Sequence, residues 1–382
     1  MKMFKKSNIR VFLFLILGAI VLQSAKCPKD TVVPSITFKK NIGGSGQNFG
    51  SQSKQTSDGG YITVGSISSK GAGQQDVYLF KTDKNGSLIW EKTFGSANAE
   101  FGSSVQATSD GGYIVVGTKF RTVTGGGQDA YIIKTDANGS LSWEKIMTTT
   151  GGGGGNSVTQ TTDGGYAFVG YVFTAFSSSL YFIKLLSNGT TAFTKTITEP
   201  SAVVGQSIKN TSDGGFIICG STNNSIYLLK TDANANVIWK KTIVANSGAT
   251  GSEVAQTKDG GYILIGNLTK DATGNSDIFL VKTDATGNTS WTKSFGTTNF
   301  ESGLSVSQTT EGGYILCGYA NIGNNSLVQL IKTDNSGNQI WLNNTHPGRG
   351  FHVQLTTDDD YIVTGFDDNG ILLLKLNKDG ML

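Results

Sequence analysis

Short apolar runs recur along the whole chain, separated by clusters of Gly, Asp, Asn and Ser. Thr108–Gly117 pairs an Asp-Gly-Gly-Tyr segment with an apolar run, and Ala130–Lys134 is apolar without alternation. An unbroken apolar run of this length is typical of a strand covered on both faces. Asp110–Gly112 and Asp136–Gly139 carry the residues of tight turns, and we expect the glycines of the first to supply positive φ angles. The pattern predicts short β-strands joined by tight turns.

The first of these segments occurs seven times, about 50 residues apart. Its acid stands at Asp58, Asp110, Asp163, Asp213, Asp259, Glu311 and Asp358. Every copy also has a glycine eight residues before the acid, a threonine two before it, a glycine seven after it, and a lysine that closes a third strand. A period of this length indicates a propeller or a solenoid.

Each copy divides into four predicted strands. In the second copy these are Ser103–Thr108, Tyr113–Thr118, Ala130–Lys134 and a strand that carries Trp143. Seven units of four strands, with the inner ones covered on both faces, predict an all-β fold, a seven-bladed β-propeller of four-stranded antiparallel blades.

The two ends of the chain complement each other. The last copy stops after Lys375–Gly380 and lacks its fourth strand, whereas Ile36–Gly43 matches Trp90–Gly95, with Phe38 in the tryptophan position. We therefore expect the N-terminal strand to complete the last blade, an arrangement that a solenoid does not need. The equivalent aromatic positions are Phe38, Trp90, Trp143, Phe193, Trp239, Trp291 and Trp341.

Periodicity changes what the composition implies. The 382 residues would suggest two or three domains, and 52 glycines are about twice the usual share. Because the glycines follow the repeat, we expect a single propeller domain over residues 36–382. Its low charged fraction of 15% fits turns and loops built from small polar residues.

The N-terminus is typical of an export signal. A basic segment up to Arg10 precedes the apolar run Val11–Leu22, which is too short to cross a bilayer as a helix. We expect residues 1–26 to be a signal peptide, Cys27 to be lipidated, and residues 27–35 to form a tether. Cleavage after Ala25, or no cleavage, are the alternatives, since Lys26 departs from the usual small residue before a lipidated cysteine.

Charge argues against nucleic acid as a partner. Five Lys and Arg residues and no acid precede Cys27, and removing them from the formal charge of +3 leaves −2. The remainder shows no basic patch of the kind that a phosphate backbone needs.

Candidate chemistry is sparse. We expect Cys219 and Cys317, at equivalent repeat positions, to be buried small hydrophobes, and His346 and His352 to be surface residues. The run Asp358–Asp360 is expected to be a solvated turn. No catalytic constellation, metal site or cofactor is predicted.

Ligand contacts are expected where the repeats differ. The turns between first and second and between third and fourth strands are nearly constant and open on one face, so the variable loops share the other face with one end of the channel. The non-repeated residues assigned to this region are Glu100, Phe101, Glu253, Phe300, Glu301, Arg121, Arg349 and His352.

The segment Lys134–Trp143, which reads Lys-Thr-Asp-Ala-Asn-Gly-Ser-Leu-Ser-Trp, resembles the blades of pyrroloquinoline-quinone-type propellers. The whole unit is more similar to the Asp-Gly-Gly-Tyr repeat propellers of exported bacterial proteins and lipoproteins. The resemblance spans about Phe38–Leu382. It implies the propeller fold and an exported protein, and it says almost nothing about the ligand. Our leading hypothesis is a monomeric propeller of the cell envelope, or a secreted one, that acts as a non-catalytic binding or scaffold module for a protein or glycan ligand. The alternative is a glycan-active hydrolase or lyase, or a degenerate quinoprotein, with its site at the channel mouth.

Overall fold

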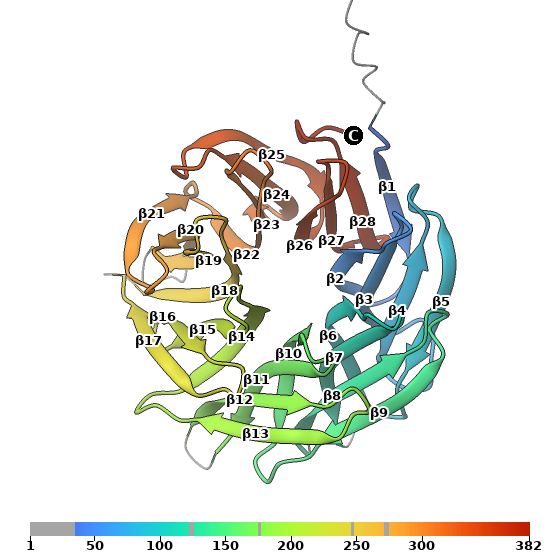
Figure 1. Ribbon diagram of the computed structural model, residues 1–382. Coiled ribbons are helices and arrows are strands. Elements are labelled where there is room, and N and C mark those ends of the chain that lie inside the picture. Colours follow the sequence, from blue (N-terminus) through green and yellow to red (C-terminus); the bar gives the residue numbers. More distant parts are fainter. Residues whose placement is uncertain (1–34, 122–125, 175–176, 246–247, 271–274) are drawn as a thin grey trace, which may run out of the picture. The chain divides into compact units, whose positions relative to one another are not determined.

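The computed structural model describes residues 35–121, 126–174, 177–245, 248–270 and 275–382 (Figure 1). Ser35–Leu382 form one compact unit. Within the described residues, the regular structure consists of 28 strands in seven four-stranded antiparallel sheets. The signal peptide, Cys27 and all of the tether before Ser35 lie outside the described residues.

The strands follow the repeat from blade to blade. Blade 1 is β2 (Phe49–Gln55), β3 (Tyr61–Ile67), β4 (Asp76–Thr82) and β5 (Leu88–Phe94). Blade 2 is β6 (Glu100–Ala107), β7 (Tyr113–Phe120), β8 (Gln128–Thr135) and β9 (Leu141–Met147). Blade 3 is β10 (Gly153–Gln160), β11 (Tyr166–Phe173), β12 (Ser178–Leu185) and β13 (Thr191–Ile197). Blade 4 is β14 (Val203–Asn210), β15 (Phe216–Thr222), β16 (Ser225–Thr231) and β17 (Val237–Ile243).

The remaining blades continue in the same order. Blade 5 is β18 (Ala249–Gln256), β19 (Tyr262–Thr269), β20 (Ser276–Thr283) and β21 (Thr289–Phe295). Blade 6 is β22 (Phe300–Gln308), β23 (Tyr314–Ile322), β24 (Asn325–Thr333) and β25 (Gln339–Pro347). Blade 7 is β26 (Arg349–Leu355), β27 (Tyr361–Asp367) and β28 (Gly370–Leu376), completed by β1 (Phe38–Ile42).

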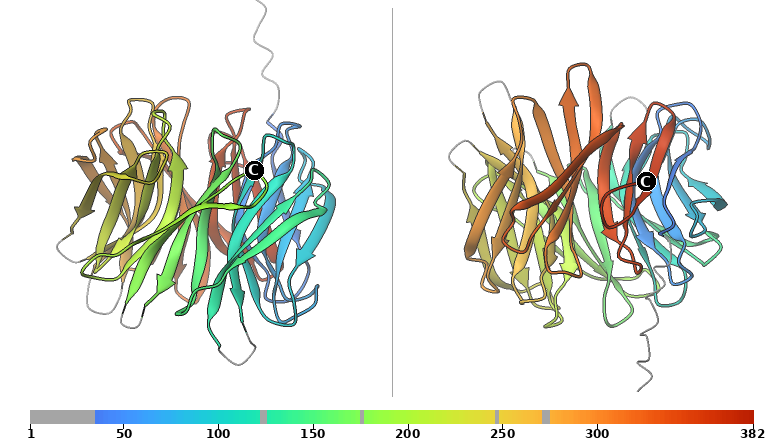
Figure 2. Two further views of the ribbon diagram at one scale, coloured as in Figure 1. Left: turned by 60° about the horizontal axis from the view of Figure 1, so that its bottom comes forward. Right: turned by 90° about the horizontal axis from the view of Figure 1, so that it is seen from above.

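The predicted seven-bladed propeller and its closure are confirmed. β1 pairs antiparallel with β28, with Phe38 opposite Lys375 and Ile42 opposite Ile371. The first strand of each blade lies innermost and contacts the first strands of its neighbours around a central channel (Figure 1). The turns that end these strands lie on one face, and the variable loops lie on the other (Figure 2).

Hydrophobic cores lie between neighbouring blades rather than inside one blade. One such core joins Ile132 of blade 2 to Phe168 of blade 3, and another joins Val169 of blade 3 to Leu229 of blade 4. The second and third strands of a blade contribute to both flanking cores, so both are apolar on their two faces, and this confirms the prediction made for the third strand. Cys219 and Cys317 are free thiols buried in these cores, which confirms their predicted packing role.

The constant glycines allow close approach between backbones. A Cβ on Gly117 would lie 1.9 Å from the carbonyl oxygen of Phe101 in the neighbouring strand. The turn glycines differ from the prediction, because only Gly111 of the pair has a positive φ (83°). Gly112 is needed for space instead, since its Cβ would lie 2.1 Å from the oxygen of Thr135.

The constant lysine pairs with the constant acid in every blade. Lys134 is buried, and its Nζ lies 2.9 Å from Asp110, whose side chain stays 60% exposed. The Nζ-to-carboxylate distances in all seven blades are 2.5–3.1 Å. This ion pair fastens the turn between the first two strands to the end of the third.

The acidic turn of blade 7 corrects a prediction. Asp359 takes the positive φ of the first turn glycine (62°), and Asp360 is buried with its carboxylate 2.8 Å from Lys375 Nζ. Because Asp358 binds the same ammonium, the run is an internal ion-pair cluster and not only a solvated turn.

Candidate functional site: the central channel

Each innermost strand carries a β-bulge directly after its constant glycine, so two successive residues line the channel. The first of them form the mouth ring: Ser51, Ser103, Asn156, Gln206, Ser252, Leu304 and Phe351. The second form the throat ring: Gln52, Ser104, Ser157, Ser207, Glu253, Ser305 and His352.

The mouth ring surrounds a hollow of about 560 Å³. Residues from the start of β18 and the ends of β15 and β19 also line it, which places the hollow at the variable-loop face. A smaller space of about 110 Å³ lies between the mouth and throat rings. The lining of both is mostly hydroxyl and amide groups, with Leu304 and Phe351 adjacent as an apolar sector.

The throat ring is tied together by hydrogen bonds between blades. In six junctions a throat side chain accepts a bond from the backbone N–H of the residue after the throat position in the next blade. These donor-to-acceptor distances are Val105 to Gln52 2.8 Å, Val158 to Ser104 3.2 Å, Ile208 to Ser157 3.2 Å, Val254 to Ser207 3.5 Å, Val306 to Glu253 3.1 Å and Val353 to Ser305 3.1 Å. The seventh junction, where blade 7 meets blade 1, differs. There His352 holds the throat position, and its Nδ1 is buried without a hydrogen-bond partner in the described structure.

Four titratable side chains meet at this level of the channel. Lys54 and Lys209 stand two residues beyond the throat position in blades 1 and 4. Lys209 Nζ lies 2.6 Å from Glu253 Oε1, and Ser305 Oγ donates to Glu253 Oε2 at 2.7 Å. Lys54 Nζ lies 3.3 Å from His352 Nε2.

Burial and mutual charge set the protonation of this group. Burial opposes ionisation of Glu253, but Lys209 and the other nearby positive charges outweigh it and lower its pKa to about 2. Burial, and then the charge of Lys209, lower the pKa of Lys54 to about 7 despite Glu253. Burial and Lys54 lower the pKa of His352 well below its usual value. At neutral pH the channel therefore holds one firm ion pair, a neutral imidazole and a lysine near its titration midpoint.

The structure thus brings together two of the sequence-assigned residues, Glu253 and His352. The expectation that His352 is a surface residue is wrong, because its side chain faces a narrow polar channel and is 4% exposed. Lys54 and Lys209 were not anticipated. The signal was present in the sequence as the only two lysines at one fixed repeat position, four residues after the constant glycine.

Glu100 and Glu301 are buried inside the framework and do not line either hollow. Each stands two residues before a constant glycine. Glu100 binds Ser96 Oγ at 2.6 Å and Lys119 at 2.8 Å, and Glu301 accepts from Thr297 Oγ1 at 2.6 Å. Their contacts fix the loops that enter blades 2 and 6.

The other assigned residues lie on the variable-loop side, away from the two rings. Phe101 packs on Phe120 and Phe300 on Tyr319, each with ring centroids 5.9 Å apart. Arg121 is paired with Asp129 at 2.6 Å.

Arg349 belongs to a separate pocket at the junction of blades 6 and 7. Its guanidinium stacks 4.6 Å from the Tyr319 ring centroid and lines a pocket of about 530 Å³ beside Asp367 and Asp368.

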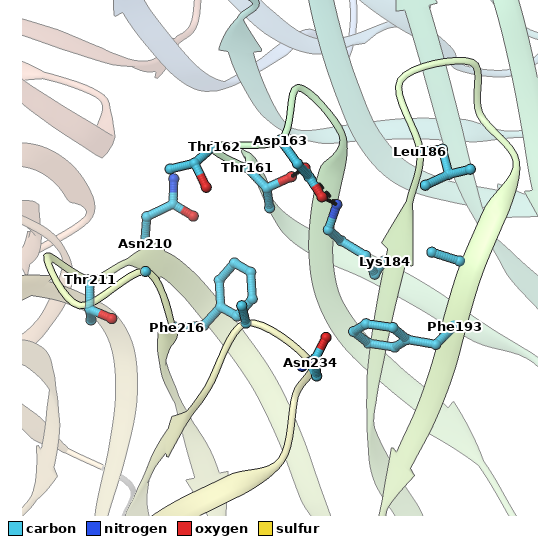
Figure 3. A pocket seen from close by; sticks show the side chains of 13 residues that line it. Thr161, Thr162, Asp163, Lys184, Leu186, Phe193, Asn210, Thr211, Phe216 and Asn234 are labelled. Carbon is cyan, nitrogen blue, oxygen red and sulfur yellow. Dashed lines mark hydrogen bonds and ion pairs between the residues drawn. The ribbon is translucent and has the colours of Figure 1, made fainter.

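A further pocket of about 210 Å³ lies between blades 3 and 4 at the opposite face (Figure 3). Elsewhere an aromatic side chain covers a turn glycine of the next blade, as Trp90 covers Gly139. Here Phe193 replaces the tryptophan, Ala235 replaces the glycine, and Phe216 replaces the usual tyrosine. Figure 3 shows the two phenylalanine rings in the pocket wall, with the Asp163–Lys184 ion pair beside them.

No three His, Cys, Asp or Glu side chains among the described residues are grouped to hold a metal ion. That part of the chain also has no helix with the length and apolar character to cross a membrane.

Comparison with known proteins supports the fold. No protein-family model matches the chain, and no curated protein matches it. Among solved structures, it is similar to the WD40 β-propeller domain of Doa1, with 15% identity, a TM-score of 0.57, and coverage of 90% of this chain and 99% of that one. The chain is also similar to YCF48 bound to D1 peptide, with 11% identity, a TM-score of 0.58, and coverage of 90% of this chain and 96% of that one. Puromycin hydrolase is similar with 13% identity and a TM-score of 0.56, and the match covers 88% of this chain but 53% of that one. At these identities the likeness shows the propeller fold alone.

Proposed function

We propose that this protein is a non-catalytic binding or scaffold module that takes a protein or glycan ligand at the mouth of its channel. The observation that carries the proposal is the hollow of about 560 Å³ within the mouth ring. The mouth position carries side chains of five kinds in the seven blades, whereas the glycine directly before it is the same in every blade. Concave sites with a few polar groups and an apolar sector are typical of ligand binding.

The lining of the mouth suits such ligands. Asn156 and Gln206 offer amide donors and acceptors, and Phe351 with Leu304 offers an apolar surface for a side chain or a sugar ring. The structural likeness to YCF48 bound to D1 peptide is in keeping with a propeller that holds a peptide.

The alternative is a glycan-active hydrolase or lyase, or a degenerate quinoprotein. A glycosidase needs two carboxylates flanking the scissile bond. Among the described residues that line the mouth and throat, Glu253 is the one acid, and both its oxygens are engaged by Lys209, Ser305 and the Val306 N–H. This arrangement favours binding over catalysis.

The proposal places the propeller in the bacterial cell envelope, tethered through a lipid on Cys27. Its support is the basic segment, the apolar run Val11–Leu22 and the cysteine that follows. Mass spectrometry of the mature N-terminus tests it: the expected species begins at an acylated Cys27, and an unmodified chain beginning at Lys26 would overturn the anchor.

Binding is tested with a glycan array and a displayed peptide library against the purified protein. We expect a selected ligand to lose at least tenfold in affinity with Phe351→Ala and to be unaffected by Lys84→Ala, an exposed residue on the opposite face. Equal effects of the two substitutions, or turnover of the ligand, would contradict the proposal.

A further inference from the structure

The charges that face the channel do not balance. Two positions of each innermost strand, the mouth and throat positions, line the hollows, and the position two residues beyond the throat shares the throat's side of the strand. In the described structure, the titratable side chains at these positions are Lys54, Lys209, Glu253 and His352. Glu253 neutralises Lys209, to which it is bound at 2.6 Å. Lys54 faces an imidazole, so one ammonium has no carboxylate of its own.

Lys54 is half-buried, and an ammonium that is partly withdrawn from water without a carboxylate beside it is costly, so two responses relieve it. Lys54 can lose its proton, or an anion can enter the channel and pair with it. The channel allows the second response because the throat is joined to the mouth hollow and is lined by small hydroxyl side chains. Among the described lining residues Glu253 is the one carboxylate, and its hydrogen bonds hold it against Lys209 and Ser305 rather than across this approach.

His352 provides a second indication. When Lys54 is an ammonium it can only donate, so His352 Nε2 must accept at 3.3 Å and the ring proton must sit on Nδ1. Nδ1 is buried and has no hydrogen-bond partner among the residues that the structure describes. The charged state of Lys54 therefore leaves two donor groups, the ammonium and the Nδ1–H, for which the protein supplies no further acceptor at the throat.

We propose that the throat is a carboxylate-binding site in which Lys54 provides the positive charge and the Lys209–Glu253 pair keeps the one acid among the described throat residues turned away. This throat site uses Lys54 and His352, whereas the proposed function uses the mouth ring. Acetate therefore tests the throat site without any larger ligand. Binding takes up a proton at Lys54 and fixes His352 as its Nδ1–H tautomer.

The pH dependence follows from the groups that face Lys54, namely Lys209 of β14, Glu253 of β18 and His352 of β26. Glu253 and His352 keep their charge states around neutrality, because their pKa values lie well below 7. Lys54 alone changes charge there. Affinity should therefore be constant from about pH 6 down to the pH at which acetate itself takes up a proton, and it should fall about tenfold per pH unit above about pH 7, as one bound proton is lost.

The experiment titrates sodium acetate into the full chain and follows the imidazole nitrogens by ¹⁵N NMR, with sodium chloride at equal ionic strength as the control. We expect acetate to shift both His352 nitrogens toward the Nδ1–H tautomer and to leave His346 unchanged. Lys54→Met should abolish the response, whereas Lys84→Met should keep it.

Glu253→Gln provides a second test, in which the expected result is a gain in acetate affinity rather than a loss of the NMR response. Removing the one acid should tighten acetate binding severalfold, because the channel then carries two lysine charges. The proposal is overturned if chloride produces the same shifts, if Lys54→Met binds acetate unchanged, or if Glu253→Gln weakens binding. A mouth variant such as Phe351→Ala should leave acetate binding intact, so failure of the proposed ligand and failure of the throat site are distinguishable.

Discussion

The outer part of the propeller and its channel treat the repeat in opposite ways. Around the outside, every blade keeps the buried lysine on its acid, and six of seven junctions keep an aromatic ring over a turn glycine. Along the channel, the throat position is Gln, Ser, Glu or His, and the position two residues beyond varies further.

The difference separates two kinds of requirement. Outer positions repeat because each blade must meet the next with the same geometry. Channel positions face open space, so fold imposes little on them beyond a hydrogen bond to the next blade. Lys54, Lys209, Glu253 and His352 depart from the channel pattern and form two contacting pairs, Lys54 with His352 and Lys209 with Glu253, whose charges act on one another. Their convergence is the strongest reason to place function there.

The largest expected effect comes from breaking the uniform framework. Gly117→Ala places a Cβ 1.9 Å from the backbone oxygen of Phe101, which cannot move without separating two strands. We expect a loss of at least about 3 kcal/mol in the free energy of unfolding, measured by chemical denaturation. Gly111→Ala is the control: its Cβ meets nothing within 4 Å, so only the positive φ costs about 1 kcal/mol. Similar losses in both variants would contradict this account.

The uniform ion pairs predict acid sensitivity. The pKa is lowered to about 2 in five turn aspartates: Asp58, Asp110, Asp163, Asp213 and Asp259. Partial burial opposes this shift, but hydrogen bonds from the lysine, the threonine and a backbone N–H outweigh it. Since the unfolded chain binds these protons first, the stabilisation is present above about pH 4 and is lost as the pH falls toward 2.

Thermal unfolding followed by circular dichroism at pH 6, 4, 3 and 2 checks this dependence. The melting temperature should be stable from pH 6 to 4 and then fall steeply. Asp110→Asn should make that fall shallower by about the share of one aspartate in five, whereas a melting temperature that is flat between pH 4 and 2 would contradict the prediction.

A smaller effect is expected at the throat ring. Ser157→Ala removes the acceptor of the Ile208 N–H and should cost about 1 kcal/mol. His352→Ser instead restores the commonest throat residue at the one junction that lacks this link, and it removes a buried nitrogen without a partner. We expect it to stabilise the protein by up to about 1 kcal/mol in denaturant titration. A destabilised His352→Ser variant would show that the imidazole is held there for stability and not for the chemistry of Lys54.

The sequence predicts the framework well for a physical reason. Seven copies in one chain show which positions are constant, such as the lysine at Lys134, and constancy identifies the blades, their closure by Phe38–Ile42 and the aromatic ring. It does not reveal partners. That Lys134 binds Asp110, or that Lys54 reaches His352 almost 300 residues away in sequence, depends on how the blades close into a circle.

The sequence singles out four non-repeated titratable residues in the same way, but two of them lie in the channel and two do not. Glu100 and Glu301 stood out as non-repeated acids, yet both stabilise loops, because the local fold supplies their donors from residues four positions earlier. Glu253 and His352 stood out equally, and only the β-bulge after the constant glycine turns them into the channel. Distinguishing the two pairs requires the register of the strands.

The smallest predicted effect concerns the junction where the outer pattern itself breaks. A Cβ on Gly139 would lie 2.6 Å from the Trp90 ring, so a junction with a tryptophan at the first position has no room for alanine at the second. At the equivalent junction Ala235 and Phe193 belong to one apolar cluster, and Phe193 lines the pocket of about 210 Å³ (Figure 3). We infer that the ring of Phe193, smaller than that of tryptophan, leaves this space. The two replacements therefore depend on each other.

A double-mutant cycle tests that dependence. Phe193→Trp alone should destabilise the protein, because its ring meets the Ala235 methyl group, and Ala235→Gly alone should change little, since the loss of a Cβ is offset by relief of a positive φ of 57°. Together they should rebuild the arrangement seen at Trp90 and fill the pocket, with a favourable coupling energy of about 1 kcal/mol. Trp143→Phe with Gly189→Ala, which converts a standard junction into the exceptional one, is the matched control and should show coupling of the same sign between its two positions. Additive effects in both cycles would mean that the pocket between blades 3 and 4 is not the consequence of a paired replacement, and that its Phe193 and Ala235 were each retained for a reason of their own.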